Sequence, residues 1–354
     1  MNKIMQKMKN NPFFSGLRTV TDWLKKYGKG GGVGQTLAAL GLIFVFQCIV
    51  LGINAGSFGA FLPKLGMTWL NILRNNSYVG LIALGSCFVI ISGGIDLSVG
   101  SILCAVGAFT MYLLDGSSGL LAAIRITGAP AYLIAILAAL LLGLVLGEIN
   151  GCLIAYGKIP PFIVTLGTML IYRSATQQLT KTFSPVVPAG FKQLASFKIG
   201  GQIILPILYW ALVAAILIVV FRKTAFGKHT VAVGSNEKAA LYAGIPVKRV
   251  KRRIYALCGV CCSVAALIYV ARIGSMDFAN AGSGYEMDAI AGVVVGGTAM
   301  SGGKGSVLGC VIGVLIMSVM NNILNSIGIP TFLCNAVKGL IIILTVLLQN
   351  RKND

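Results

Sequence analysis

The sequence predicts an all-α polytopic membrane protein with about ten transmembrane helices, some of them short or discontinuous. Of its 354 residues, 56% are hydrophobic and only 11% are charged, and the mean hydropathy is +0.87. Soluble domains carry about a quarter charged residues. The formal net charge is +20, but the basic residues are spread between long apolar runs. This pattern favours a membrane protein with basic loops over a protein that binds nucleic acid.

Residues 1–35 form a basic segment ahead of the first apolar span. Lysines and arginines flank a set of larger apolar residues that recur at helical spacing, namely Phe13, Phe14, Leu17, Val20, Trp23, Leu24 and Tyr27. We expect a cytoplasmic amphipathic helix that lies in the membrane interface, and a disordered basic tail is the alternative. Residues 36–350 are expected to form the transmembrane domain.

Ten apolar segments follow this N-terminal part. A helix that crosses a bilayer needs about 20 apolar residues, and fewer where it is broken or shielded by neighbours. The predicted crossings cover residues 36–54, 72–92, 99–114, 131–156, 161–179, 203–221, 254–271, 288–300, 306–324 and 332–348. The third and eighth segments are short and rich in glycine, so we expect either of them to be re-entrant or discontinuous.

The charges of the loops predict the orientation, because cytoplasmic loops collect Lys and Arg. With ten crossings and a cytoplasmic N-terminus, 20 of the 29 basic residues lie on the inner side and 8 on the outer side, while Lys338 lies within the last span. The loop 222–253 holds the largest inner group. The distribution predicts that both termini are cytoplasmic.

Glycines recur every four residues in two of the predicted spans. Gly143, Gly147 and Gly151 form one repeat, and Gly305, Gly309 and Gly313 form the other. Small residues at this spacing let two helix backbones approach closely in lipid. We therefore expect tight helix packing at both repeats, and the motif says nothing about a substrate.

The residues needed for catalysis or metal binding are sparse. The chain has no G-x-x-x-x-G-K-[ST] loop, and the nearest string, Ser301–Ser306, has the wrong spacing. No paired carboxylates accompany the single histidine, His229. The C-x-x-C-C run at Cys258, Cys261 and Cys262 lies in an apolar segment and is interpreted as packing residues. The sequence predicts no metal site and no enzymatic activity of its own.

A glycine-rich polar turn, Ser92–Ser101, separates the second and third spans. Its glycines permit a sharp change of direction, and Asp96 and Ser98 are suited to cap the helix that follows. The same pattern is typical of a hinge or gate where an interrupted helix lines a transport pathway. The residues alone favour neither interpretation.

The cytoplasmic loop 222–253 contains one predicted short helix within Gly234–Pro246. Asn236 is placed to cap its beginning, and Gly244 is placed to end it. A short exposed helix with small residues suits insertion into a groove on a cytosolic partner. A solvated basic loop that only sets the topology is the alternative, and the spacing alone favours it.

Several polar residues lie in or near the predicted spans. They are Glu148, Asn150, Thr165, Thr168, Asn321, Asn322 and Asn325. Polar groups in hydrocarbon are costly, so they usually face a partner group or an aqueous path. Helix–helix hydrogen bonds and a substrate route explain these residues equally well.

At these motifs the chain resembles the membrane permease subunits of bacterial ABC importers for monosaccharides, most strongly those of the ribose type. The resemblance rests on IDLSVGS at Ile95–Ser101, PFIVTLGT at Pro161–Thr168 after Asn150-Gly151, and the loop from Phe226 to Ile245. It continues through Tyr285–Ala291, Gly296–Thr298, Ser301–Gly305, Asn321-Asn322 and Val337–Gly339. The motifs occur in the family's order from about residue 70 to residue 348.

The resemblance implies a permease of the bacterial inner membrane that imports a monosaccharide of the ribose or galactose type. It implies a homodimer, separate ABC ATPase subunits that bind ATP and Mg, and a periplasmic or lipid-anchored sugar-binding protein; this chain itself would bind no cofactor. The coupling helix that docks on the ATPase would include Gly234, Asn236, Glu237, Ala239, Ala240 and Gly244. This role replaces the solvated-loop interpretation.

The resemblance also suggests where the sugar is handled. We assign the gate or translocation pathway to Asp96, Ser98, Asn150, Thr165, Thr168, Asn321 and Asn322, and docking of the binding protein to Glu286 and Asp288. Relatives usually carry a small or apolar residue at Glu148, so no role is carried over to it. An ion-coupled secondary transporter that uses Glu148 is the second hypothesis, and a membrane-embedded enzyme or structural channel is the third.

Overall fold

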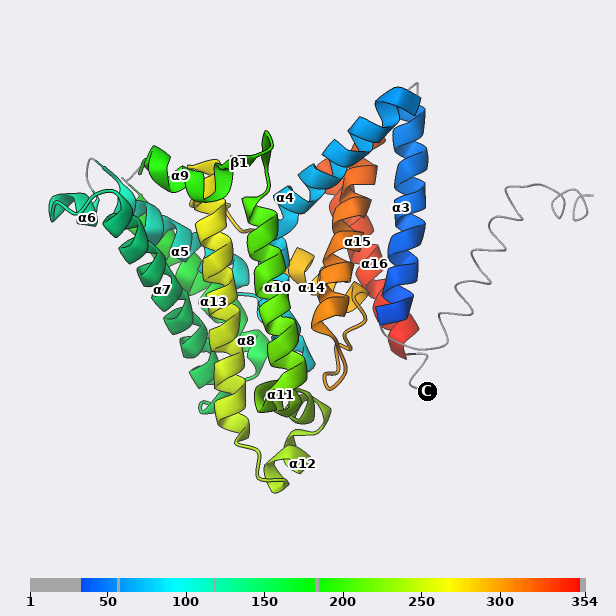
Figure 1. Ribbon diagram of the computed structural model, residues 1–354. Helices are drawn as coiled ribbons and strands as arrows, with labels where there is room; N and C mark the ends of the chain where they lie inside the picture. Colours follow the sequence, from blue (N-terminus) through cyan, green and yellow to red (C-terminus); the bar gives the residue numbers. More distant parts are fainter. Residues whose placement is uncertain (1–32, 56–57, 117–118, 182–184, 351–354) are drawn as a thin grey trace, which may run out of the picture.

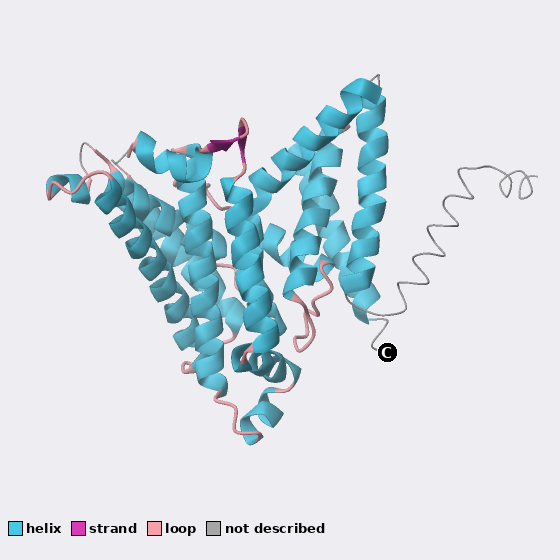
Figure 2. Cartoon of the chain, viewed as in Figure 1, coloured by secondary structure: helices cyan, strands magenta, loops and turns pink. Residues whose placement is uncertain are grey.

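The computed structural model describes residues 33–55, 58–116, 119–181 and 185–350. The predicted amphipathic helix lies almost wholly outside these residues. Within them every regular element is a helix except one small antiparallel hairpin, β1 Lys198–Ile199 with β2 Gln202–Ile203 (Figures 1 and 2). The all-α class is thereby confirmed.

Ten of the helices coincide with the ten predicted apolar segments. They are α3 Val33–Ala55, α4 Phe58–Ile91, α5 Val99–Leu114, α7 Ala129–Ala155, α8 Pro161–Thr180, α10 Leu205–Lys223, α13 Val247–Ile273, α14 Tyr285–Val295, α15 Val307–Ser326 and α16 Thr331–Asn350. Four short helices connect them, namely α6 Leu120–Ala123, α9 Ala189–Ser196, α11 Ala225–Ser235 and α12 Glu237–Tyr242.

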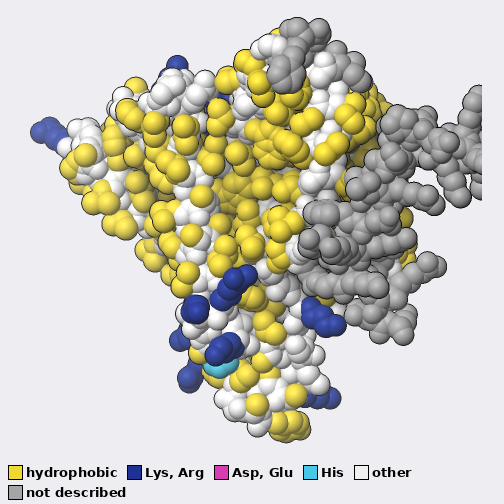
Figure 3. Space-filling model, turned by 45° about the vertical axis from the view of Figure 1, so that its right-hand side comes forward, with side chains coloured by type: hydrophobic (Ala, Val, Ile, Leu, Met, Phe, Trp, Pro, Cys, Tyr) yellow, Lys and Arg dark blue, Asp and Glu magenta, His cyan; other side chains and the backbone are white. Residues whose placement is uncertain are grey.

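The bundle has two recognisable ends. The β-hairpin, α6 and α9 lie at one end, called the hairpin end, and α11 and α12 lie at the other, called the α12 end (Figure 1). Hydrophobic side chains cover the middle of the visible face, and Lys and Arg gather near the α12 end (Figure 3). An apolar belt next to a basic end is typical of a membrane protein, because Lys and Arg collect on the cytoplasmic side of the bilayer.

Five helices are long and apolar enough to cross a membrane by themselves, within the described parts of the chain. These are Val33–Gly52, Ala129–Ala155, Leu205–Lys223, Val247–Ile273 and Val307–Ser326. In the first three of these helices, only 22% of the residues in the most apolar stretch are buried inside the bundle. Side chains such as Leu137 on α7 and Leu212 on α10, 58% and 60% exposed, therefore face outward where lipid is the natural solvent. The chain is a polytopic membrane protein.

Helix α13 lies at the centre of the bundle and packs against α4, α5, α7 and α9. Tyr255, Cys258, Cys261 and Cys262 on this helix are buried. Their positions agree with the packing role predicted for the cysteine run. All nine cysteines are free thiols.

The glycine repeats lie where helices touch backbone to backbone, as predicted. A Cβ on Gly143 would meet Ser263 and the carbonyl of Gly259, and one on Gly147 would meet the carbonyl of Tyr255. The second repeat faces α14, where Gly309 and Gly313 would meet the carbonyls of Gly296 and Gly292. These contacts let α7 approach α13, and α15 approach α14, closely enough for dispersion forces to hold them together.

The chain reaches α14 through an irregular segment, residues 274–284, that runs alongside α5. A Cβ on Gly107 would meet Met276, the thiol of Cys104 donates to the carbonyl of Phe278 at 3.5 Å, and Gly282 lies against Gly100. Contacts with α5 therefore follow each other in antiparallel order. A non-helical stretch thus precedes the short helix α14, and a re-entrant or discontinuous eighth segment stays a prediction.

The α7–α13 contact yields a stability prediction. Gly147→Ala places a methyl group against the carbonyl of Tyr255, and overpacking of this kind costs about 1–3 kcal/mol. We expect the midpoint of thermal unfolding in detergent to fall. Gly41→Ala is the matched control, because nothing lies within 4 Å of its Cβ position on α3. Equal midpoints for the two variants would contradict the packing assignment.

Candidate functional site

The polar turn between α4 and α5 is built around a buried carboxylate. Asp96 is 2% exposed, and its Oδ1 accepts hydrogen bonds from the backbone N–H of Ser98 at 2.9 Å and from the Ser98 hydroxyl at 2.6 Å. Ser98 is the first residue before α5, but its side chain makes no capping bond to that helix. The capping predicted for Ser98 is therefore wrong, because its Oγ accepts from Asn150 instead and its backbone, with φ of −82° and ψ of −8°, is helical rather than extended.

The Ser98 hydroxyl also joins the turn to two other helices. Asn150 on α7 donates through Nδ2 to Ser98 Oγ at 2.8 Å. Tyr172 on α8 donates to Asn150 Oδ1 at 3.4 Å and to the carbonyl of Leu146 at 3.0 Å. Asp96, Ser98, Asn150 and Tyr172 form what we call the polar network. The sequence predicted its first three members, and Tyr172 was missed.

The two threonines of the PFIVTLGT motif lie beside this turn. Thr165 donates to the carbonyl of Pro161 at 2.8 Å and makes a longer contact, 3.4 Å, with the carbonyl of Ile95. Tyr255 of α13 donates to the same Ile95 carbonyl at 3.3 Å. Thr168 is buried but bonds to carbonyls of its own helix. Thus Thr165 reaches the turn directly and Thr168 does not.

The asparagine pair lies elsewhere in the bundle. Asn322 on α15 accepts a hydrogen bond from Gln47 on α3 at 3.2 Å, so its amide joins these two helices and not the turn before α5. Asn321 Oδ1 is buried without a hydrogen-bond partner among the described residues. The structure therefore divides the predicted pathway residues into two separate groups.

Glu148 has a basic neighbour that the sequence analysis did not identify. Its Oε2 lies 3.2 Å from Nε of Arg252, so the two side chains form an ion pair between α7 and α13. Both side chains are about one-third exposed. An ion pair between neighbouring helices accounts for a carboxylate at this position.

Helix α12 forms as predicted, at the tip of the α12 end. Asn236 accepts a hydrogen bond from the backbone N–H of Ala239 at 3.0 Å, and Gly244 has a φ of +78°, a conformation that favours glycine. Glu237 pairs with Lys251 of α13 at 2.7 Å, and Ala240 is buried. The loop 222–253 contains more helix than predicted, because α11 and the first turns of α13 occupy most of it.

The segments around α12 meet the polar turn backbone to backbone. The N–H of Gly303 donates to the carbonyl of Ile91 at 2.8 Å, and a Cβ on Gly234 would meet that same carbonyl. A Cβ on Gly302 would meet Gly93. Three segments from distant parts of the sequence therefore touch, namely the end of α4 with the turn after it, the end of α11, and the loop before α15, and we call this contact the glycine junction.

A polar cavity of about 260 Å³ opens beside the junction. Its lining includes Ser92, Gly94, Asn236, Glu237 and Lys251. Residues at the start of α12 and of the polar turn thus line the same cavity.

Glu286 and Asp288 lie in the first turn of α14, next to the irregular segment. Glu286 accepts a hydrogen bond from the N–H of Gly284 at 3.1 Å and lies close to Gly100. Asp288 pairs with Lys338 of α16 at 2.7 Å. Lys338, placed within the last span by its sequence, thereby acquires a counter-ion.

These features define an integral membrane protein. Its buried polar turn is connected to the exposed helix α12 through the glycine junction. A family model described as branched-chain amino acid transport system / permease component matches residues 68–346. The chain belongs to this family.

Named relatives cover most of the chain. The ribose import permease protein RbsC of Bacillus subtilis is 42% identical over 327 residues, which span 91% of this chain and 95% of the relative. The RbsC protein of Escherichia coli K12 is 38% identical over 80% of this chain and 85% of the relative. The D-allose transport system permease protein AlsC of E. coli K12 is 34% identical over 85% of this chain and 89% of the relative. No solved structure matches the chain.

The polar network yields a coupling prediction. In a double-mutant cycle with Ser98→Ala and Asn150→Ala, we expect a coupling energy of about 0.5–3 kcal/mol, because each side chain loses its direct partner. The measurement is the free energy of unfolding in mixed detergent and SDS. Thr110→Ala combined with Asn150→Ala is the control, since buried Thr110 bonds only to its own helix. Additive effects in the Ser98 cycle would contradict the network.

Proposed function

We propose that this protein is the permease subunit of an ATP-binding-cassette importer that carries a monosaccharide across the bacterial inner membrane. Relatives at 34–42% identity are named for the import of ribose and the transport of D-allose. A galactose/methyl galactoside import permease of Haemophilus influenzae is 33% identical over 88% of this chain. The range of cargoes supports a pentose or hexose of the ribose or galactose type.

The proposed topology has ten crossings with both termini and α12 in the cytoplasm. The ten helices that match the predicted spans support this number, with residues 274–284 and α14 together forming the discontinuous eighth crossing. The basic side chains near the α12 end support the cytoplasmic placement (Figure 3). The hairpin end would then face the sugar-binding protein.

One observation carries the proposed role of α12: it is exposed at its tip and anchored at its base. Leu241 and Tyr242 are 61% and 88% exposed, which is unusual for large apolar side chains outside the lipid belt. Ala240 is buried, and Glu237 is tied to Lys251. Such a helix suits a groove on a cytosolic ATPase, where ATP and Mg would bind, because this chain has no nucleotide loop of its own.

In this proposal the glycine junction carries movement from the ATPase to the pathway. Gly234, just before α12, lies on the carbonyl of Ile91, and the turn that begins at Ser92 leads directly to Asp96. Because backbone atoms in contact cannot be compressed, a shift of α12 displaces the turn. Binding and hydrolysis of ATP would then bias the outward and inward states of two permease copies.

The proposal assigns the pathway to residues around the turn, with a second copy completing the pore. Asp96, Ser98, Asn150 and Thr165 belong to this region through their hydrogen bonds. Thr168, Asn321 and Asn322 stay predicted pathway residues, and Glu286 and Asp288 stay predicted docking positions. The ion pair between Glu148 and Arg252 favours a structural role for Glu148 over ion coupling.

Co-purification tests the proposed role of α12. Tyr242→Asp places a charge on the exposed tip of the helix, so we expect retention of the co-expressed ATPase to fall at least tenfold while the permease keeps its thermal midpoint. Leu179→Asp is the control, because Leu179 is 82% exposed but lies at the end of α8, away from α12. Undiminished retention in the Tyr242 variant would contradict the docking role.

The same preparations separate the importer from the ion-coupled alternative. In vesicles, we expect sugar uptake only when the ATPase, the binding protein and ATP are all present. Uptake by the permease alone on an ion gradient would overturn the importer function.

A further inference from the structure

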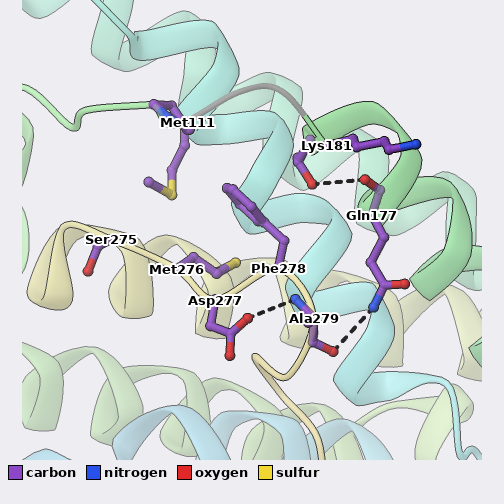
Figure 4. A pocket seen from close by; sticks show the side chains of 10 residues that line it. Met111, Gln177, Lys181, Ser275, Met276, Asp277, Phe278 and Ala279 are labelled. Carbon is purple, nitrogen blue, oxygen red and sulfur yellow. Dashed lines mark hydrogen bonds between the residues drawn. The ribbon is translucent and has the colours of Figure 1, made fainter.

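A second, larger cavity lies at the hairpin end, far from the glycine junction. Its volume is about 510 Å³, within the range of small-molecule sites. Met111 near the end of α5, Gln177 and Lys181 around the end of α8, and Asp277 and Phe278 of the irregular segment line it (Figure 4). Side chains from three elements therefore converge on one space.

The irregular segment that forms one wall is held in place by polar contacts. Arg173 of α8 donates to the carbonyl of Ala281 at 2.6 Å, and Gln177 donates to the carbonyl of Ala279 at 3.5 Å. Asp277 accepts from the N–H of Ala279 at 3.0 Å and from the amide of Asn280 at 2.9 Å. Side-chain hydrogen bonds thus hold this wall in place although it is neither helix nor strand. Within a membrane, such irregular backbone is tolerated where it is buried in protein or lines an aqueous cavity.

The lining combines groups of three kinds. Asp277 offers carboxylate oxygens, which hydrogen bonds from Asn280 and Ala279 hold in place. Gln177 adds a donor and an acceptor, whereas the ammonium group of Lys181 points away from Met111 and Phe278 (Figure 4). Phe278 and Met111 supply an apolar surface, as Figure 4 shows.

These groups fit a neutral ligand with many hydroxyls and one apolar face. Carboxylate oxygens and a side-chain amide bind hydroxyl groups without requiring a charge on the ligand. Hydroxyl groups both donate and accept, so they match this mixed set, and the C–H face of a sugar ring packs on an aromatic side chain.

We propose that this cavity is a monosaccharide-binding site on the delivery side of the permease, occupied before the sugar enters the pathway. The assignment rests on the proposed function, because the cargo class comes from there. It adds a binding step to the permease itself, at residues none of which belongs to the polar network or to α12.

Direct binding to the purified permease, without ATPase or binding protein, tests the site. The probes are D-ribose and D-galactose, titrated to tens of millimolar and followed by saturation-transfer NMR. We expect saturable binding of at least one sugar. Phe278→Leu removes the aromatic face and Asp277→Asn weakens an acceptor while keeping the shape of the side chain. Each is expected to lower the affinity at least fivefold.

Leu179→Ala is the matched control, because Leu179 is 82% exposed and lies near the cavity on α8 without lining it. We expect it to bind like the original chain, and all variants to keep its thermal midpoint. Absence of saturable binding, or unchanged affinity in both cavity variants, would overturn the site. ATP-driven uptake by the full complex would still support the proposed function in that case, whereas loss of uptake of every sugar by the unaltered complex would contradict the function itself.

Discussion

The contact among Ile91, Gly234 and Gly303 is the constraint on which the rest of the account depends. One backbone carbonyl, at the end of α4, accepts from the N–H of Gly303 and lies against Gly234. Side chains at either glycine would force the three segments apart. The position of α12 relative to the turn before α5 is consequently fixed by main-chain atoms, which have no rotamers with which to absorb a displacement.

The turn on the other side of this junction buries a carboxylate, and removing that charge from water costs free energy. Asp96 sits in the interior with two hydrogen bonds to Ser98, while its Oδ2 has no hydrogen-bond partner among the described residues. A buried carboxylate that is incompletely satisfied is destabilising in the arrangement shown.

Patterns among neighbouring residues predicted the helices, their ends and the glycine contacts. They did not predict hydrogen bonds and ion pairs between residues far apart in the sequence. Apolar length placed the helices, the cap at Asn236 and the stop at Gly244 placed α12, and four-residue spacing placed the glycine contacts. Tyr172 escaped because an aromatic residue in an apolar span is normally packing, and its hydrogen bond depends on where α7 lies. The ion pairs of Arg252 and Lys338 were missed for the same reason, and the Ser98 cap failed because Asn150, distant in sequence, donates to its hydroxyl oxygen.

Gly234→Ala measures the central claim most directly, because its Cβ would press on the carbonyl of Ile91 without altering the exposed surface of α12. In proteoliposomes with ATPase and binding protein, both ATP hydrolysis and sugar uptake are recorded, with Gly41→Ala as the control. The account predicts that the variant still binds the ATPase and hydrolyses ATP, but transports at least fivefold fewer sugars per ATP. An unchanged ratio of sugar to ATP in a stably folded variant would contradict it.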